Sequence, residues 1–545
     1  VIAYFVKKDQ EKENEKENWH LGYGSRILSI ISGQNQLSED EKKSTEQAGF
    51  ILQQSYEPEP SITGTTFASA IRAQGIINQE KFDKLPVEEI VKKLKDEWSP
   101  AKLKEKYKGE DDFHKPHNAE GVGGQIQSSI SRRLQGFISK ATLFFEKDVI
   151  EEHFLYSFFR GTEEAIKNNR ALAVETDWDN FIKLCLAIKA SGEKEPLHGE
   201  KKDRDSFSGW LAGWRSIHSA MADVLQILLK EEDNKTVIDF KKYRDDIFGI
   251  LKYLLKYPDP TPENEKPETA SMTSGGPNNQ QLVSDPFTMA INTVRGRAFQ
   301  TFMFFIYPDG RNPENKNEVK IKEDVKKLYE DVLDKEDTRA LMFMFGHYLP
   351  SFYFRDIKWI QSLLPKIFPK ESEKKYLYLA AWEGYLANNL YYEIFIDPNF
   401  QELYQYALSV DIDDAGRRYF RDPDDGIAIH LALAFVHYKD FGFEHPLFKA
   451  FWENKDFEPH SHFVSFIGRS FVSGDNVVTN EFLEKESIGK KKIREFWDWL
   501  LSNHDDPKTF IAFGFWINIE KNIFEPKWLA EHLRKTFEKS KGVID

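Results

Sequence analysis

Apolar residues recur every three or four positions along most of this chain. In LPVEEIVKKLKDEW, Val87, Ile90, Val91 and Leu94 fall at that spacing, which places them on one face of a helix. Further stretches repeat the pattern: DVIEEHFLYSFFRGTEEAIKNN, WDNFIKLCLAIKAS, SAMADVLQILLKEE and DDIFGILKYLLKY. Strand-like alternation is scarce, and the initial VIAYFV is its best example. The pattern predicts an all-α protein with at most a minor N-terminal strand element.

Polar breaks rich in Pro and Gly separate these stretches. The longest, YPDPTPENEKPETASMTSGGPNNQQLVSD, covers residues 257–285 and has the composition of a loop or linker. It predicts an N-terminal helical array over 1–256 and a C-terminal helical array over 286–545. Helices in series without βαβ alternation favour an irregular, TPR-like α-solenoid of degenerate helical hairpins. No repeat of fixed period is found, which excludes a tandem consensus array.

The stretch DPFTMAINTVRGRAFQTFMFF (285–305) predicts one long amphipathic helix. Asp285 suits the N-cap and Pro286 the first helical position. The residues predicted to form its buried stripe are Phe287, Ala290, Ile291, Val294, Ala298, Phe302 and Phe305.

A glycine lies off that stripe, between two arginines. Gly296 in mid-helix costs about 1 kcal/mol relative to alanine, so we expect another helix to approach closely there. Arg295 and Arg297 would then pair with carboxylates or helix C-termini, and anion binding is the alternative. Gly384 in AAWEGYLANNLYYEIF and Gly514, which lies between two phenylalanines, are predicted to serve the same packing role.

Overall composition bears on three questions: whether the chain binds nucleic acid, whether it spans a membrane, and where in the cell it lies. The formal net charge is −14 and the pI about 5.6, which argues against direct nucleic-acid binding. No run approaches 18 apolar residues, so no membrane span is expected. The single cysteine, Cys185, permits neither an internal disulfide nor a Cys-rich zinc site. This cysteine usage is typical of a reducing compartment and predicts a cytoplasmic location.

Motifs for nucleotide binding and hydrolysis are missing from the sequence. ESIGKKKI lacks the upstream glycine and the hydroxyl residue of a phosphate-binding loop, and neither G-x-S-x-G nor H-E-x-x-H occurs. DIDDAGRRYFRD nearly matches a calcium loop through Asp411, Asp413 and Gly416. Ala415 and Asp422 depart from that motif, and an acidic helix-capping loop is the preferred interpretation. We expect no catalytic, cofactor-binding or metal-binding residues, and therefore no enzyme activity, in this chain.

The histidines leave one enzymatic alternative open. A metal-dependent hydrolase would require His430, His437 or His504 to converge with acidic residues, and His460 and His462 in EPHSHF are further candidates. Separate core histidines are the simpler interpretation.

Basic and aromatic residues occur together in RRYFRD. Arg417, Arg418, Tyr419 and Arg421 are the candidate partner-binding residues, because they could meet a phosphate or an acidic patch. The alternative is a solvated turn that the nearby DPDDG neutralises.

Four stretches together resemble segments of one known protein family. The first is DPFTMAINTVRGRAFQTFMFF. The second is FGHYLPSFYFRDIKWIQSLLPKIFP with YLAAWEGYLANNLYYEIF, whose Ala-Trp-Glu-Gly-Tyr run is the most distinctive match. The third joins REFWDWLL, FIAFGFWI and FEPKWLAEHL, and a weaker fourth lies near residues 85–121. These stretches resemble the C-terminal sensor region of the antiviral STAND NTPases known as AVAST proteins. None of these motifs is catalytic.

The resemblance implies a function. It implies that this chain senses a conserved phage protein, either the large terminase subunit or the portal protein. Binding would trigger homo-oligomerisation and effector activation by upstream domains, and those domains would carry the ATP and Mg²⁺. The chain begins with Val1, and we expect it to be a fragment that starts within a longer protein. A generic helical protein–protein interaction scaffold remains the main alternative.

Overall fold

The structure is a computed structural model that describes residues 73–108, 116–147, 149–194, 211–265, 285–410, 420, 422–472, 488–517 and 522–543. All of these lie within one compact unit, Arg72–Asp545. The predicted strand in VIAYFV lies outside the described residues.

The described part of the chain is all-α, as predicted. Besides two isolated bridges, Glu232–Lys235 and Arg311–Val319, it contains no strand. The helices before the 257–285 segment are α4 Gln79–Lys84, α5 Val87–Asp96, α6 Pro100–Lys106, α7 Ala119–Arg132, α8 Leu134–Ile138, α9 Glu152–Asn168, α10 Arg170–Val174, α11 Asp179–Ser191, α12 Trp214–Leu229 and α13 Phe240–Leu254.

The helices after that segment make up the rest of the described chain. They are α14 Pro286–Asn292, α15 Val294–Gly310, α16 Glu323–Leu333, α17 Arg339–Tyr353, α18 Ile357–Ile367, α19 Lys375–Leu386, α20 Tyr392–Phe395, α21 Pro398–Ser409, α22 Pro423–His437, α23 Pro446–Asn454, α24 Phe457–Ile467, α25 Ile488–Asn503, α26 Pro507–Ile511 and α27 Pro526–Lys539. Among the described helices, none is both long enough and apolar enough to cross a bilayer.

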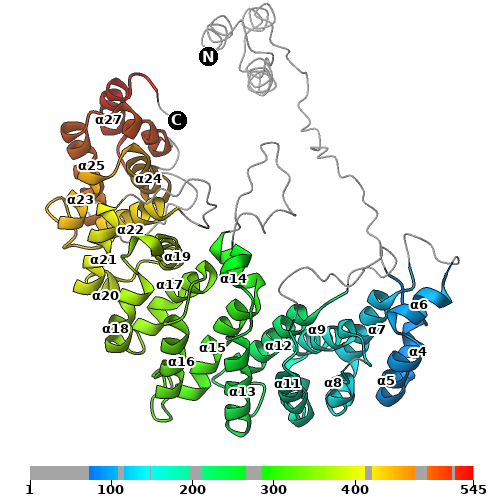
Figure 1. The fold of residues 1–545 in the computed structure, drawn as a ribbon. Coiled ribbons are helices and arrows are strands. Elements are labelled where there is room, and N and C mark those ends of the chain that lie inside the picture. Colours follow the sequence, from blue (N-terminus) through cyan, green and yellow to red (C-terminus); the bar gives the residue numbers. More distant parts are fainter. Residues whose placement is uncertain are drawn as a thin grey trace, which may run out of the picture. The chain divides into compact units, whose positions relative to one another are not determined.

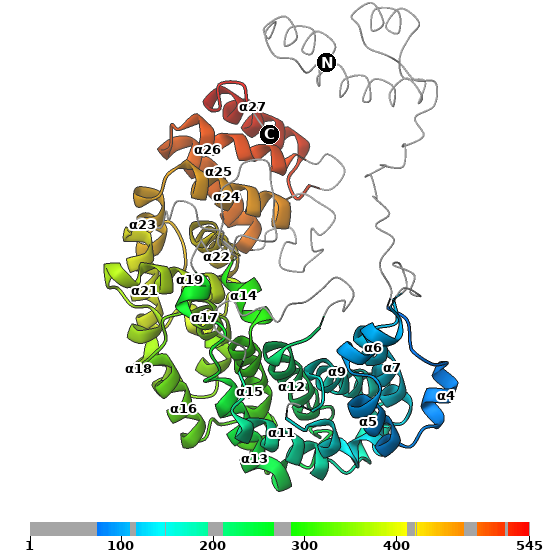
Figure 2. The same cartoon turned by 45° about the vertical axis from the view of Figure 1, so that its right-hand side comes forward.

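Helices pack mainly against neighbours in sequence. Each member of the series α7, α9, α12, α15, α17, α19, α22 and α24 contacts the next (Figures 1 and 2). Intervening helices pair as α11 with α13, α16 with α18 and α21 with α23, and α13 and α18 also pack on the first series. A hairpin array requires such neighbour contacts, and the solenoid itself stays a prediction.

Several helices begin at an Asp-Pro pair. The Asp285 carboxylate accepts the Thr288 N–H at 2.8 Å, and the Asp506 carboxylate accepts the Lys508 N–H at 3.0 Å. In both, the following proline occupies the first helical turn, where its missing N–H loses no hydrogen bond. These two starts agree with the sequence prediction.

The prediction of one long helix over 285–305 is wrong. Thr293 has an extended backbone (φ −115°, ψ 154°) and separates α14 from α15. The Asp259 carboxylate accepts the Val294 N–H at 2.9 Å, so a residue far away in sequence caps the second helix. Ile291, predicted to be buried, is 38% exposed, because the break turns α14 out of register with α15.

Gly296 does make a close helix contact. A Cβ there would lie 2.6 Å from the Ala290 carbonyl carbon, which is closer than real Cβ atoms come to another heavy atom. The approaching helix is α14, folded back against the start of α15. Arg295 pairs with Glu336 and donates to the Leu255 carbonyl at 3.1 Å, at the C-terminus of α13.

Gly384 lies where α19 crosses α17. A Cβ on Gly384 would lie 2.8 Å from the His347 nitrogen and closer still to the Phe343 oxygen. Gly346 faces it on α17, where a Cβ would lie 2.8 Å from the Ala381 carbonyl carbon. The two backbones can approach only because neither position carries a side chain.

Gly514 is half-buried in the 3₁₀ helix η6 Ala512–Trp516. The glycine in close contact with this helix is Gly468, where a Cβ would lie 2.8 Å from the Trp516 indole nitrogen. A small residue therefore lies on the facing element, at the end of α24.

The 257–285 segment does not separate two compact units. Helices on both sides of it lie within Arg72–Asp545, and α12 and α13 contact α15 directly. The Arg295 N–H donates to the Asp259 carbonyl at 2.9 Å, which joins the start of the segment to the helix that follows it.

Candidate partner-binding surface

The predicted partner-binding residues, Arg417, Arg418, Tyr419 and Arg421, lie outside the described residues. The calcium-like residues Asp411, Asp413 and Gly416 lie outside them as well. A surface for a partner therefore has to be sought elsewhere on the described helices.

Two of the candidate histidines lie on α22, His430 in the core and His437 at the exposed end of the helix. His430 Nδ1 lies 2.7 Å from the Tyr404 hydroxyl and its Nε2 lies 3.2 Å from the Asn388 carbonyl oxygen. His437 packs its ring 5.3 Å from Phe471, and burial lowers its pKa. Both ring nitrogens of His430 are therefore satisfied within the protein.

Two other histidines meet around a tryptophan. The His460 and His504 rings are 5.7 Å apart, and Trp452 contacts both at 4.2 Å and 4.9 Å. Burial lowers the pKa of His460 to about 4. Across the residues that the structure describes, no group of three His, Cys, Asp or Glu side chains is placed to hold a metal ion.

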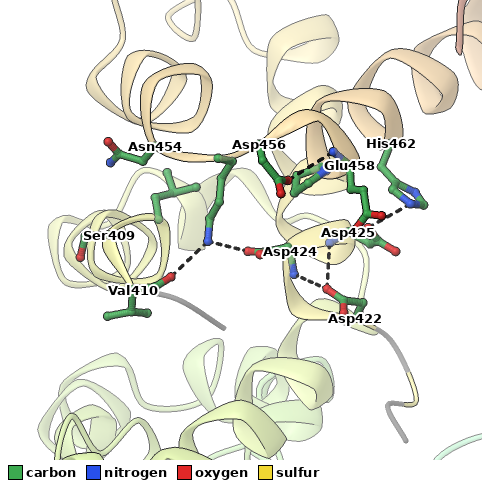
Figure 3. Close-up of a pocket in the computed structure, with 12 residues that line it drawn as sticks. Ser409, Val410, Asp422, Asp424, Asp425, Asn454, Asp456, Glu458 and His462 are labelled. Carbon is green, nitrogen blue, oxygen red and sulfur yellow. Dashed lines mark hydrogen bonds and ion pairs between the residues drawn. The ribbon is translucent and has the colours of Figure 1, made fainter. Parts of the chain in front are cut away.

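An acidic hollow of about 880 Å³ lies between the starts of α22 and α24 (Figure 3). Its carboxylates largely serve helix starts, since Asp422 accepts the Asp424 N–H at 2.9 Å and Asp456 accepts the Glu458 N–H at 3.3 Å. The hollow is lined by Leu408, Ser409, Val410, Asp422, Asp424, Asp425, Asn454, Lys455, Asp456, Glu458, Pro459 and His462.

Ion pairs cross this acidic hollow between helices. Lys455 Nζ lies 2.8 Å from the Asp424 carboxylate, and His462 Nε2 lies 3.1 Å from the Asp425 carboxylate (Figure 3). Burial raises the pKa of Asp425 to about 6, and His462 opposes that rise. Asp422 and Asp456 therefore serve as helix caps, and Asp424 and Asp425 serve as ion-pair partners. These contacts join α22 to α23 and α24, and Lys455 extends them to the end of α21 by donating to the Val410 carbonyl.

A second hollow, of about 470 Å³, opens where α12, α15 and α17 end. We call it the α12–α15–α17 pocket. It has an aromatic wall on α15 and α17, a buried methionine at its base, and a polar rim from the residues after α12. It is lined by Leu229, Lys230, Glu231, Asp233, Asn234, Met303, Phe304, Tyr307, Arg311, Tyr348 and Ser351.

The wall and rim are held in place by specific contacts. Arg311 forms an ion pair with Glu231, with Nε 3.3 Å from the carboxylate. The Arg355 guanidinium lies 4.5 Å from the Tyr307 ring and donates to the Ser351 hydroxyl at 2.8 Å. Burial raises the pKa of Tyr348 to about 12, and a hydrogen bond with Gln300 opposes that rise.

Exposed rings extend from this pocket along the ends of the helices. Phe354, beside Arg355, lies 5.4 Å from Tyr391, and Tyr392 lies 4.8 Å from Tyr438. Phe354, Tyr391 and Tyr392 are 52%, 37% and 41% exposed. We call Tyr307, Phe354, Tyr391, Tyr392 and Tyr438 the aromatic strip. Exposed aromatic rings beside an arginine match the composition of interface hot spots.

An ion network joins α9, α12 and α15. Asp223 on α12 pairs with Arg297 on α15 and lies 3.3 Å from Arg160 on α9. Burial raises the pKa of Asp223 while Arg297 lowers it. Arg297 is thus engaged by a carboxylate, as the packing interpretation of Arg-Gly-Arg requires.

Analysis of the sequence did not identify the aromatic strip. Its signal was present in FYFRD and NLYYEIF, because adjacent rings cannot all point to one buried helix face. Comparison with known proteins adds no relatives: no protein-family model matches the chain, and neither the curated proteins nor the solved structures give a match.

Proposed function

We propose that this chain is the ligand-sensing module of an antiphage STAND NTPase. In this proposal it binds a phage protein, the large terminase subunit or the portal protein, and thereby triggers oligomerisation and effector activation by upstream domains. Nucleotide chemistry, with its ATP and Mg²⁺, belongs to those upstream domains. The resemblance of its sequence motifs to those of AVAST sensors supports the choice of partner.

The observation that carries the binding role is the aromatic strip beside the α12–α15–α17 pocket. A partner that covers these exposed rings would gain roughly 25 cal/mol of binding free energy for each Å² of apolar surface that it buries. Phe354 is about half-exposed and in contact with a second exposed ring, Tyr391. Tyr and Arg side chains also lose little conformational entropy when a partner docks, because their contacts here already hold them.

Helices in series can present this strip to a large, folded partner. Signalling assemblies commonly bury more than about 2,000 Å², which exceeds what one hairpin offers. The strip draws on the ends of α15, α17 and α22 and the start of α20. Arg355 stacks on Tyr307, Phe354 contacts Tyr391, and Tyr392 contacts Tyr438. Binding energy from such a surface could bias an equilibrium in upstream domains.

Purified terminase and portal proteins test the proposal. Wild-type chain should co-elute with one of them in size-exclusion chromatography and should show saturable binding by calorimetry. The double variant Phe354→Ser/Tyr391→Ser should weaken that binding by about tenfold or more, as expected for hot-spot residues. Phe537→Ser on α27 removes a ring that is equally exposed, at 51%, and should leave affinity unchanged.

Failure has two recognisable forms. If neither phage protein binds the wild-type chain, the proposed sensing role is wrong. If one binds but the double variant binds as tightly as the Phe537→Ser control, the role survives and the aromatic strip is not the surface that performs it.

A further inference from the structure

Residues 257–265 join the end of α13 to the starts of two later helices, α15 and α17, and we call them the 257–265 clamp. Tyr257, Asp259 and Glu265 are buried, whereas residues 261–264 are half-buried or exposed. The clamp is therefore buried at its two ends and accessible between them. Its two ends are held in different ways.

Backbone and side chain together hold the Asp259 end. The Asp259 carboxylate accepts the Val294 N–H at 2.9 Å, and its carbonyl accepts the Arg295 N–H, also at 2.9 Å. The Arg295 guanidinium donates to the Leu255 carbonyl at 3.1 Å and to the Pro260 carbonyl at 3.2 Å. These hydrogen bonds tie the start of α15 to the end of α13. Main-chain carbonyls accept all but the first of them, and a main-chain carbonyl cannot rotate away as a side chain can.

Among the contacts of the described residues, one side chain holds the other end. The Glu265 carboxylate accepts the Arg339 N–H at 2.7 Å and the Ala340 N–H at 3.1 Å, and it lies 3.6 Å from the Arg339 guanidinium. These two N–H groups begin α17, and the first four N–H groups of a helix have no partner within that helix. Thr261 and Asn264 hydrogen-bond to each other inside the turn. Glu265 is thus the residue through which the clamp reaches α17.

The Glu265 contact combines a gain with a cost. Hydrogen bonds from N–H groups at a helix start favour a carboxylate, whereas removing the carboxylate from water disfavours its charge. Burial raises the pKa of Glu265, and the neighbouring Glu336 carboxylate adds to that rise. The Arg339 and Ala340 N–H groups and the Arg339 guanidinium oppose the rise without cancelling it. The ionised side chain therefore gains little net free energy by docking on α17.

We propose that the 257–265 clamp has one fixed end, at Asp259, and one releasable end, at Glu265, so that the start of α17 opens while α15 stays held. The inference goes beyond the proposed function and does not depend on it. Phe354 of the aromatic strip directly follows the last residue of α17. Release of Glu265 therefore acts on a helix that also contributes to the strip, and it gives that helix a local freedom that α15 lacks.

Hydrogen–deuterium exchange of the wild-type chain, read by mass spectrometry of short overlapping peptides, tests the release. The amides of Arg339 and Ala340 should exchange through local opening, at a rate that hardly changes in dilute urea, because local opening exposes little surface. The amides of Val294 and Arg295 should exchange through larger openings, at a rate that rises with urea. Equal urea dependence at the two helix starts would overturn the inference.

A pair of variants tests whether Glu265 is the releasable contact. Glu265→Gln keeps the size of the side chain but removes its charge and one acceptor oxygen. It should speed exchange at Arg339 and Ala340 about fivefold, as expected for a weakened helix cap, and leave exchange in α9 and α12 unchanged. Glu263→Gln makes the same change on an exposed side chain of the same turn and should leave exchange unchanged throughout.

Three results would contradict the assignment of Glu265. Equal effects of Glu265→Gln and Glu263→Gln would show that Glu265 does not hold the start of α17. Faster exchange of Glu265→Gln throughout the chain, or failure of this variant to fold, would show that docking of Glu265 belongs to the global fold and is not released locally. Either of these last two results would overturn the inference.

Discussion

Replacing Gly384 by alanine tests the packing explanation for the glycines directly. The added Cβ would lie 2.8 Å from the His347 backbone nitrogen, and closer to the Phe343 oxygen, whereas ordinary contact begins at roughly 3.4 Å. Both neighbours are backbone atoms of α17, so neither can rotate away. The variant can form only if α17 and α19 move apart by more than about 1 Å at their crossing, because the Phe343 oxygen is the limiting contact.

The magnitude follows from opposing contributions. Alanine in place of glycine stabilises a helix interior by about 1 kcal/mol. Overpacking costs typically 1–3 kcal/mol, and more where backbone must shift. Separation also stretches the hydrogen bond from the Asn388 amide to the His347 carbonyl, now 2.9 Å, which contributes about 1 kcal/mol. The net expectation is a loss of about 1–3 kcal/mol in unfolding free energy.

Urea denaturation followed by far-UV circular dichroism measures the effect. Gly384→Ala should unfold at a lower urea concentration than wild type. Gly124→Ala is the matched control, because Gly124 lies in the exposed interior of α7 with no heavy atom within 4 Å of the added Cβ. It should unfold at a higher urea concentration than wild type, because alanine raises the free energy of unfolding by about 0.5–1 kcal/mol. Equal shifts in the same direction for both variants would refute the close-contact reasoning.

Three further outcomes are expected. Arg295→Met should lower the free energy of unfolding by about 3–5 kcal/mol, because it leaves the buried Glu336 carboxylate without its ion-pair partner. Adding Glu336→Gln should recover part of that loss in urea denaturation. No recovery would contradict the pairing. The pKa of Asp425, about 6 in the folded chain, lies above its unfolded value, so folding takes up a proton as pH falls from about 7 to 4. Stability relative to Asp425→Asn should therefore rise over that range, and a fall would contradict the burial of this carboxyl beside His462. Burial raises the pKa of the Cys185 thiol, so Ellman's reagent should react with it only in urea; rapid reaction of native protein would place the thiol at the surface.

Local features of the sequence predicted the helices well. Apolar spacing placed α5, α9, α11, α12 and α13, and the Asp-Pro pairs at Asp285 and Asp506 marked two helix starts. Both signals act within one or two turns of chain, where spacing and side-chain capping depend only on nearby residues.

The break at Thr293 had no comparable local signal. Apolar spacing runs on through Ala290, Val294 and Ala298 as if the helix were continuous. What ends α14 and starts α15 is the carboxylate of Asp259, which caps Val294 from 35 positions earlier in the chain. This long-range hydrogen bond ends the helix in spite of the continuous apolar spacing. Because the spacing depends only on nearby residues, it could not predict the break.

The sequence by itself determined the all-α class, and it pointed to Gly296 and Gly384 as positions where backbones come close. Only the tertiary structure decided which backbone each glycine meets, such as Gly384 against Phe343. It alone also brought Lys230, Tyr307 and Tyr348 from three helices into one pocket. The helices could be predicted because helix formation depends on interactions between residues a few positions apart. A binding surface could not, because its side chains meet only after helices that are distant in sequence have packed together.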